Sequence, residues 1–205
     1  LGWGLRDICG NMSVSHTGGL PGMLSRTVMI PDLELGVVVL TNTANGGGGV
    51  FTAVSRTIVD SYLGLKDAGW TKRIVAGSRA YEGAGADVVK KVWDQVAKSS
   101  SKPIKASTFI GIFEDPWFGK VEVFLKKKQL WIRSHRSPKL NGQLQLYKEG
   151  VFAVRWEYQD LIGDAFVIYQ FDEKGQPTKI ELKGISPNID FSFDFHDLNL
   201  KRITK

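Results

Sequence analysis

Residues 12–42 read MSVSHTGGLPGMLSRTVMIPDLELGVVVLTN, a stretch that holds three strand patterns separated by short turns. The last pattern is almost continuously apolar, which is typical of a strand buried on both faces. Strands joined by turns this short pair with opposite directions, so the stretch predicts an antiparallel meander. The predicted strands cover residues 12–16, 24–30 and 35–40, and their turns contain Gly18-Gly19 and Pro31-Asp32.

An amphipathic helix is predicted to follow the meander. A run of glycines at 46–49 precedes it, and Gly64 supplies a natural C-terminal stop. Apolar residues spaced four apart form one face of this helix: Val50, Val54, Ile58 and Tyr62. We therefore expect residues 1–65 to form one small unit of strands and a final helix.

Residues 66–102 have the character of a helical connector. Segments 70–81 and 86–97 show helical patterns, and glycines at 83 and 85 predict a break between them. The Ser- and Lys-containing run 99–103 ends in a proline and is typical of a linker. We place a domain boundary at its end, between residues 102 and 103.

From residue 107 onward the pattern is β throughout. Eight short strands within about one hundred residues, with no helix between them, indicate an up-and-down barrel or a sandwich. The turn signals 148–150 and 172–175 are of the kind that close hairpins. The predicted strands are 109–113, 120–127, 129–134, 143–148, 151–157, 165–171, 178–183 and 198–203.

Composition and charge exclude several classes of function. The formal net charge is +6, but the basic residues are spread along the chain, and the lysines at 126–128 fit a hairpin turn. Without a basic stripe interleaved with aromatics, we expect no nucleic-acid partner. No apolar run reaches the length of a membrane span. The single cysteine, Cys9, excludes an internal disulfide.

The motif that carries chemistry is His16-Thr17-Gly18-Gly19, at the end of a predicted strand. A donor at the first position can support proton movement or hold a substrate carboxylate, and the Thr hydroxyl can bind the same carboxylate. Glycine keeps the strand surface clear for a substrate acyl group, and the Gly19 N–H can stabilise an oxyanion. A purely structural interpretation, with His16 at a strand end and the glycines in a tight turn, is the alternative for so short a match.

The order of parts around this motif resembles the end of a β-lactamase-like serine hydrolase domain, the family of penicillin-binding proteins, esterases and D-amino-acid peptidases. In that family a Lys-Thr-Gly or His-Thr-Gly strand borders the active site, and three antiparallel strands and a C-terminal helix close the domain. Residues 1–5 resemble the preceding strand. The resemblance implies an α+β fold: the C-terminal piece of the hydrolase domain at 1–65, a helical connector at 66–102, and a lipocalin-like eight-stranded β-barrel at 103–205.

In this family the nucleophile lies in a Ser-x-x-Lys motif that precedes the Lys/His-Thr-Gly strand by hundreds of residues. Only 15 residues precede His16, and Ser99-Ser100-Ser101-Lys102 lies after it and before a proline, so we interpret that match as chance. No Tyr-x-Asn motif is present, and the three histidines lack metal-ligand spacing. We therefore expect no metal or cofactor, and no activity until an N-terminal segment or a partner chain supplies the serine.

The substrate implied by the resemblance is a small ester, amide, lactam or peptide. His16, Thr17 and Gly18 would bind it, while His16, Thr17 and Gly19 would line the edge of the catalytic site and its oxyanion hole. A different class of function stays open: the barrel is a non-catalytic module that binds a lipophile, or it serves assembly, including homo-oligomer formation. Because many relatives act outside the cytoplasm, the resemblance implies a periplasmic or other extracytoplasmic location.

Overall fold

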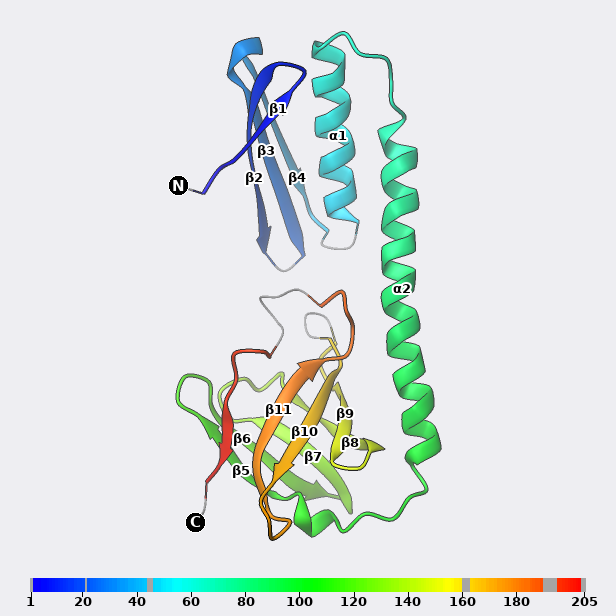
Figure 1. Ribbon diagram of the computed structural model, residues 1–205, viewed down its shortest axis with the longest axis vertical. Coiled ribbons are helices and arrows are strands. Elements are labelled where there is room, and N and C mark those ends of the chain that lie inside the picture. The colour runs from blue at the N-terminus through cyan, green and yellow to red at the C-terminus, as the bar shows by residue number, and fades with distance from the viewer. Residues whose placement is uncertain (1, 21, 44–45, 160–162, 190–194, 204–205) are drawn as a thin grey trace. The chain divides into compact units, whose positions relative to one another are not determined.

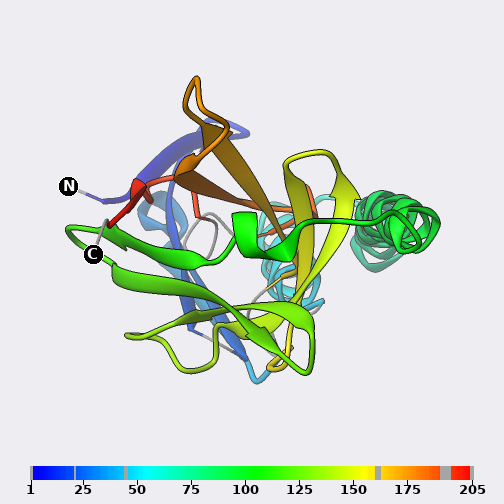
Figure 2. The ribbon, with the colours of Figure 1, turned by 90° about the horizontal axis from the view of Figure 1, so that it is seen from below.

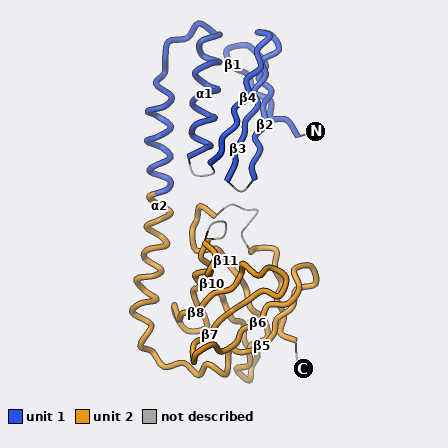
Figure 3. The backbone as a smooth tube through the Cα atoms, turned by 180° about the vertical axis from the view of Figure 1, so that it is seen from behind, with its two compact units in different colours: residues 1–82 blue, residues 83–205 orange. Residues whose placement is uncertain are grey.

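A computed structural model describes residues 2–20, 22–43, 46–159, 163–189 and 195–203 (Figure 1). The chain divides into two compact units, Leu1–Glu82 and Gly83–Lys205, which Figure 3 shows in different colours. Within the described residues, two α-helices accompany a four-stranded sheet and a closed eight-stranded barrel. The expected α+β fold with an eight-stranded antiparallel barrel is therefore confirmed.

The first unit contains an antiparallel sheet in which the strands follow one another in sequence order. Helix α1 packs mainly against β3 and β4 and buries a small apolar core between the helix and the sheet (Figure 1). The predicted meander and helix are thus confirmed, although the first strand begins at Gly4. The elements are β1 (Gly4–Ile8), β2 (Asn11–Leu20), β3 (Met23–Ile30), β4 (Leu35–Thr41) and α1 (Gly47–Tyr62).

The two faces of this sheet differ strongly in exposure. Because side chains alternate along a strand, every second residue of β3 and β4 turns toward α1, among them the buried Val28 and Val37. The intervening residues lie on the opposite face, which we call the open face. Large apolar side chains on the open face are exposed, including Val38 at 65% and Leu40 at 77%. The prediction that the strand at 35–40 is buried on both faces is therefore wrong for this chain, because only its α1 side is covered.

Helix α2 (Trp70–Ser99) is one continuous helix of 30 residues, so the predicted break at its glycines is wrong. An interior glycine costs a helix about 1 kcal/mol relative to alanine, and packing of the later turns offsets this cost. Val92 and Val96 are buried against Ala153 and Ile185 of the second unit. Neither described helix is both long enough and apolar enough to cross a bilayer.

The second unit is built around an up-and-down barrel in which each strand pairs with the next in sequence. The last strand then pairs with the first, through Lys201 opposite Glu114 and Arg202 opposite Phe113. The predicted strands are confirmed to within a few residues. They are β5 (Gly111–Asp115), β6 (Gly119–Lys126), β7 (Gln129–Ser134), β8 (Asn141–Lys148), β9 (Val151–Trp156), β10 (Ala165–Phe171), β11 (Pro177–Gly184) and β12 (Leu200–Arg202).

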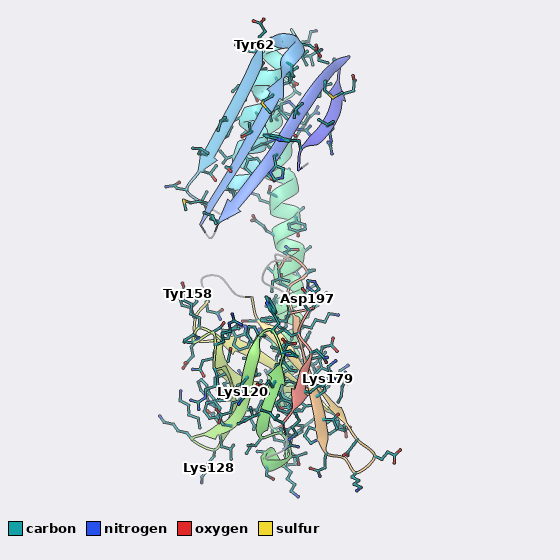
Figure 4. The ribbon with its side chains drawn as sticks, turned by 90° about the vertical axis from the view of Figure 1, so that its left-hand side faces the viewer. Tyr62, Lys120, Lys128, Tyr158, Lys179 and Asp197 are labelled. Atoms are coloured by element: carbon teal, nitrogen blue, oxygen red, sulfur yellow. The ribbon has the colours of Figure 1, made fainter. Side chains whose placement is uncertain are left out.

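The β6–β7 hairpin confirms the turn predicted for the lysine run. Lys127 and Lys128 have φ angles of 52° and 65°, so both central residues of this two-residue turn lie in the left-handed region. Such turns match the twist of the flanking strands but favour Asn and Gly over other residues. Figure 4 shows Lys128 at one end of the barrel and Tyr158 near the other.

The barrel interior is filled by its own side chains. Phe113, Phe152, Val154, Val167 and Leu200 belong to one continuous buried cluster and are all fully buried. At one end Phe109 lies edge-on to Phe152 and to Tyr169, with ring centroids 4.8 and 5.0 Å apart. The Tyr169 hydroxyl donates to the Phe109 carbonyl at 3.0 Å, and burial raises the pKa of this tyrosine. The interior is a packed core of the kind that small barrels commonly have.

The later turns of α2 lie against the outside of the barrel, beside the yellow β8–β9 segment in Figure 2. The Trp93 indole N–H donates to the Asp164 carboxylate at 2.7 Å. Arg155 stacks over the Trp93 ring at 4.3 Å and also reaches the same carboxylate oxygen, at 3.3 Å. The Ser99 hydroxyl donates to the Tyr147 carbonyl. The helix is therefore anchored to the wall by both apolar and polar contacts.

A buried carboxylate joins the beginning of the barrel to its end. Asp115, at the end of β5, accepts backbone N–H groups of Trp117 at 2.8 Å and Phe118 at 2.7 Å. Its other oxygen accepts the N–H of Asn199, just before β12, at 2.7 Å. One side chain thus holds the β5–β6 turn beside the segment that leads into the closing strand.

Candidate functional site

The motif lies where one edge of β2 has no partner strand among the described residues, and we call this the free edge. Strand β1 pairs with β2 from Ile8 opposite Asn11 to Gly4 opposite Ser15, and that pairing ends just before His16. Residues 16–20 pair with β3 on the other side. An unpaired strand edge presents backbone N–H and C=O groups that can bind an extended ligand. The sequence motif therefore occupies a part of the sheet that is open to such a ligand.

The side chains of His16 and Thr17 point to opposite faces of the sheet. His16 pairs with Thr27 and lies on the open face, where its ring is edge-on to Trp3 at a centroid distance of 6.1 Å. Thr17 pairs with Arg26 and lies on the face that α1 covers in part. The structure thus brings the two side chains to one strand edge but not to one face.

The two glycines of the motif are close to side chains on β3. A Cβ atom at Gly18 would lie 2.7 Å from the Ser25 hydroxyl oxygen, and one at Gly19 would lie 3.2 Å from a Leu24 methyl group. Glycine at these positions is therefore explained by packing, and it also keeps the strand surface clear. Both interpretations of the motif fit this geometry.

The Ser-x-x-Lys match of the sequence begins at the end of a helix. Ser99, the first serine of the Ser-x-x-Lys match, is the last residue of α2 and is 1% exposed, with its hydroxyl bonded to Tyr147. A nucleophilic serine of this family begins a helix, so the interpretation of the match as chance agrees with the structure. Across the described part of the chain, no cluster of His, Cys, Asp and Glu is placed to hold a metal ion.

Sequence reasoning missed a cleft on the α1 side of the sheet. It has a volume of about 710 Å³ and is bounded by β1, β2, β3, α1 and the first residue of α2. Three arginines from different elements line it: Arg6, Arg26 and Arg56. Strand alternation places Arg6 and Arg26 on one face, but their convergence depends on the register of three strands and on the position of α1.

Comparisons with known proteins give one family and a few distant structural likenesses. The model of the family described as "Domain of unknown function (DUF3471)" matches residues 95–202. A search of curated proteins finds no match. Two crystal structures of SurE, one of them with D-Leu, share 10% identity at a TM-score of 0.38 and align with 98% of this chain.

The octameric penicillin-binding protein homologue from Pyrococcus abyssi shares 14% identity at a TM-score of 0.26 over 97% of this chain. The chain spans only 35–38% of the length of these solved structures. Likeness at this level carries no argument about activity, and the resemblance to β-lactamase-like hydrolases stays a prediction. The family model, in contrast, covers more than half of the chain, and the protein therefore belongs to the DUF3471 family.

Proposed function

We propose that residues 1–65 form one wall of a serine hydrolase site of the β-lactamase-like type, with the nucleophile supplied by polypeptide outside this sequence. The observation that carries the proposal is the position of His16-Thr17-Gly18-Gly19 on the free edge of β2. The surrounding order, an antiparallel meander followed by a helix on one face, is the order that the resemblance implies.

The free edge suits an acyl substrate. A substrate carbonyl that lies along residues 16–20 can accept a backbone N–H at Gly19, and this donor would stabilise the oxyanion formed when serine attacks. The Thr17 hydroxyl and the His16 ring offer polar groups on either side of the strand. The expected substrates are small esters, amides or lactams.

The open face of the sheet supports the need for further polypeptide. Its exposed apolar side chains include Leu5, Met12, Leu20 and Met23, besides Val38 and Leu40. Soluble proteins rarely leave contiguous apolar surface of this kind uncovered. A covering layer on this face would lie on the side of the sheet that carries His16.

A fluorophosphonate probe tests the proposal, because it labels activated serines covalently. We expect no labelling of this chain alone, and labelling of a longer form that carries an upstream Ser-x-x-Lys segment. In the longer form His16→Ala should slow labelling, whereas His135→Ala, which removes an exposed histidine paired with Glu122 on the barrel, should not. Labelling of the isolated chain, or none in the longer form, would overturn the proposal.

The filled barrel interior argues against the alternative that this protein carries a lipophile. Most interior side chains are fully buried and contact one another, as the Phe152 and Tyr169 rings do. Titration with fatty acids should therefore leave tryptophan fluorescence unchanged. A saturable response would favour a binding module instead. A role of the barrel in assembly stays a proposal that light scattering on the longer protein can test.

A further inference from the structure

The cleft on the α1 side of the sheet gathers cationic and hydroxyl groups. Alternation and register place Arg6, Ser13, Ser15, Thr17 and Arg26 on the same face of β1, β2 and β3. Since α1 packs mainly against β3 and β4, this part of the face stays open to a ligand. Helix α1 lines the other side of the cleft through Ser55 and Arg56.

The positive charge of this cleft is not neutralised within the described residues of the chain. Among the residues that the structure describes, Arg6, Arg26 and Arg56 form no ion pair. The Arg26 Nε is buried and has no hydrogen-bond partner, while one terminal nitrogen donates to the Thr52 hydroxyl at a long 3.4 Å. Burial, followed by the charges of Arg56 and Arg6, lowers the pKa of Arg26.

Asp60 and Trp70 also affect which ligands the cleft can bind. The carboxylate of Asp60, which is the acidic group on the helix side, accepts the Trp70 indole N–H at 2.6 Å. Arg56 lies over the Trp70 ring at 4.4 Å and is held in place by it. The lining therefore holds three arginines and two aspartates, Asp60 and Asp7, and the Asp7 side chain lies on the opposite face of β1 from Arg6. Positive charge is in excess, so the cleft favours anions over cations.

We propose that this cleft binds a small oxyanion, a carboxylate or a phosphate group, between Arg26 and Arg6. A guanidinium presents its N–H groups as a planar fork that matches such an anion with two parallel hydrogen bonds. The Arg26 Nε is buried, so the ligand would pair with the terminal nitrogens of this guanidinium, one of which makes only the long bond to Thr52. Thr17 and Ser15 offer hydroxyl donors from the floor of the cleft.

The anion site uses other side chains than the proposed hydrolase site on the free edge of β2, and a different experiment tests it. His16 lies on the open face, whereas Arg6 and Arg26 lie on the other. The anion site needs no nucleophile and no added polypeptide. An anion bound there would rest against the back of the motif strand, next to Thr17.

The test uses this chain, with inorganic phosphate and acetate as separate probes at constant ionic strength. The arginine Nε–H signals are followed by ¹H–¹⁵N NMR, and affinity is measured by isothermal titration calorimetry. We expect a saturable shift of the Arg26 signal with one probe or both, and the tighter probe identifies the ligand class. No saturable shift with either probe would overturn the proposal.

Variants connect the binding to the cleft. Arg26→Met and the more exposed Arg6→Met should each weaken binding about tenfold or more, the loss expected when a charge-assisted contact of at least about 1.4 kcal/mol is removed. Arg73→Met is the matched control, because Arg73 also lies near the Trp70 ring but does not line the cleft. Thermal unfolding shows whether each variant is folded. If a folded Arg6→Met variant binds as well as the parent, or Arg73→Met weakens binding equally, the proposed site is wrong.

Discussion

Replacing Asp115 should open the barrel at its closure. The carboxylate is 4% exposed and accepts three backbone N–H groups, from Trp117, Phe118 and Asn199, at 2.7–2.8 Å. These contacts join the β5–β6 turn to the segment before β12. No other side chain of the described residues accepts three such bonds across this junction.

The magnitude follows from the donors left without an acceptor. A buried donor that loses its partner costs about 1–3 kcal/mol, and Asp115→Ala removes the acceptor of three donors. Water that reaches the three donors would replace part of the lost bonding, so their combined cost is lower than three full penalties. We therefore expect the free energy of unfolding to fall by about 4 kcal/mol. Asp115→Asn keeps one oxygen for the turn but directs an NH₂ group at the Asn199 N–H, and should cost about 2 kcal/mol.

The same contacts predict a dependence of stability on pH. The N–H of Phe118, followed by those of Asn199 and Trp117, lowers the pKa of Asp115 below its ordinary value despite the opposing effect of desolvation. A group whose pKa is lowered by folding contributes stability that is fully present above the pKa of the unfolded chain, about 3.9. That contribution is lost as the pH falls through the lower pKa of the folded state.

Urea unfolding at neutral pH and at a series of acidic pH values, followed by tryptophan fluorescence, measures both effects. Asp172→Asn is the control, because Asp172 also accepts two backbone N–H groups in a hairpin turn, at 2.9 and 2.8 Å, but is exposed. It should cost less than about 1 kcal/mol. Equal losses for the two asparagine variants at neutral pH, or an unchanged acid dependence in Asp115→Asn, would refute the reasoning.

Three further predictions concern α2 and the β6–β7 turn. Gly83→Ala should stabilise α2 by about 0.5–1 kcal/mol, because an added Cβ meets open space. At Gly85 an added Cβ would displace the Asn188 side chain, which should offset that gain, so thermal unfolding should shift upward for Gly83→Ala and not for Gly85→Ala. Replacing Lys127-Lys128 by Asn-Gly should raise the free energy of unfolding by about 1 kcal/mol, since both positions have positive φ, and a loss of stability in urea would contradict this. Trp93→Phe should cost about 1–3 kcal/mol by removing the indole donor from a buried carboxylate, and hydrogen exchange in the later turns of α2 should accelerate.

Local patterns predicted most of the fold. The barrel strands alternate apolar and polar residues and are separated by turn residues, so their positions follow from the sequence to within a few residues. The helix break was predicted wrongly because the sequence shows the low helix propensity of glycine but not the tertiary contacts that stabilise the helix in spite of it. Gly85 is buried against Asn188, and Val92 and Val96 are buried on the barrel wall.

Of the two candidate sites, the motif on β2 can be predicted from local sequence, whereas the arginine cleft depends on tertiary structure. The residues of the motif on β2 are contiguous, so a sequence pattern can find them, and their alternation between faces follows from the period of a strand. The arginine cleft combines Arg6, Arg26 and Arg56, which are up to fifty positions apart. Its existence depends on the pairing of β1 with β2 and on which strands α1 covers, and a single sequence does not specify either.

The closing pair of the barrel has a consequence for how the second unit folds. Strand β12 has three residues, and it joins strands β5 and β11 through two residue pairs on each side. Its partner β5 lies at the opposite end of the barrel sequence, so the barrel can close only after the seven preceding strands have formed. Closure also has a large entropic cost, because it joins two segments that are far apart in the chain. Until then, β5 and β11 are unpaired edges on which a second chain can add a strand. The period before closure is therefore when this protein is most prone to aggregate, and refolding yield should fall with protein concentration more steeply than native stability suggests.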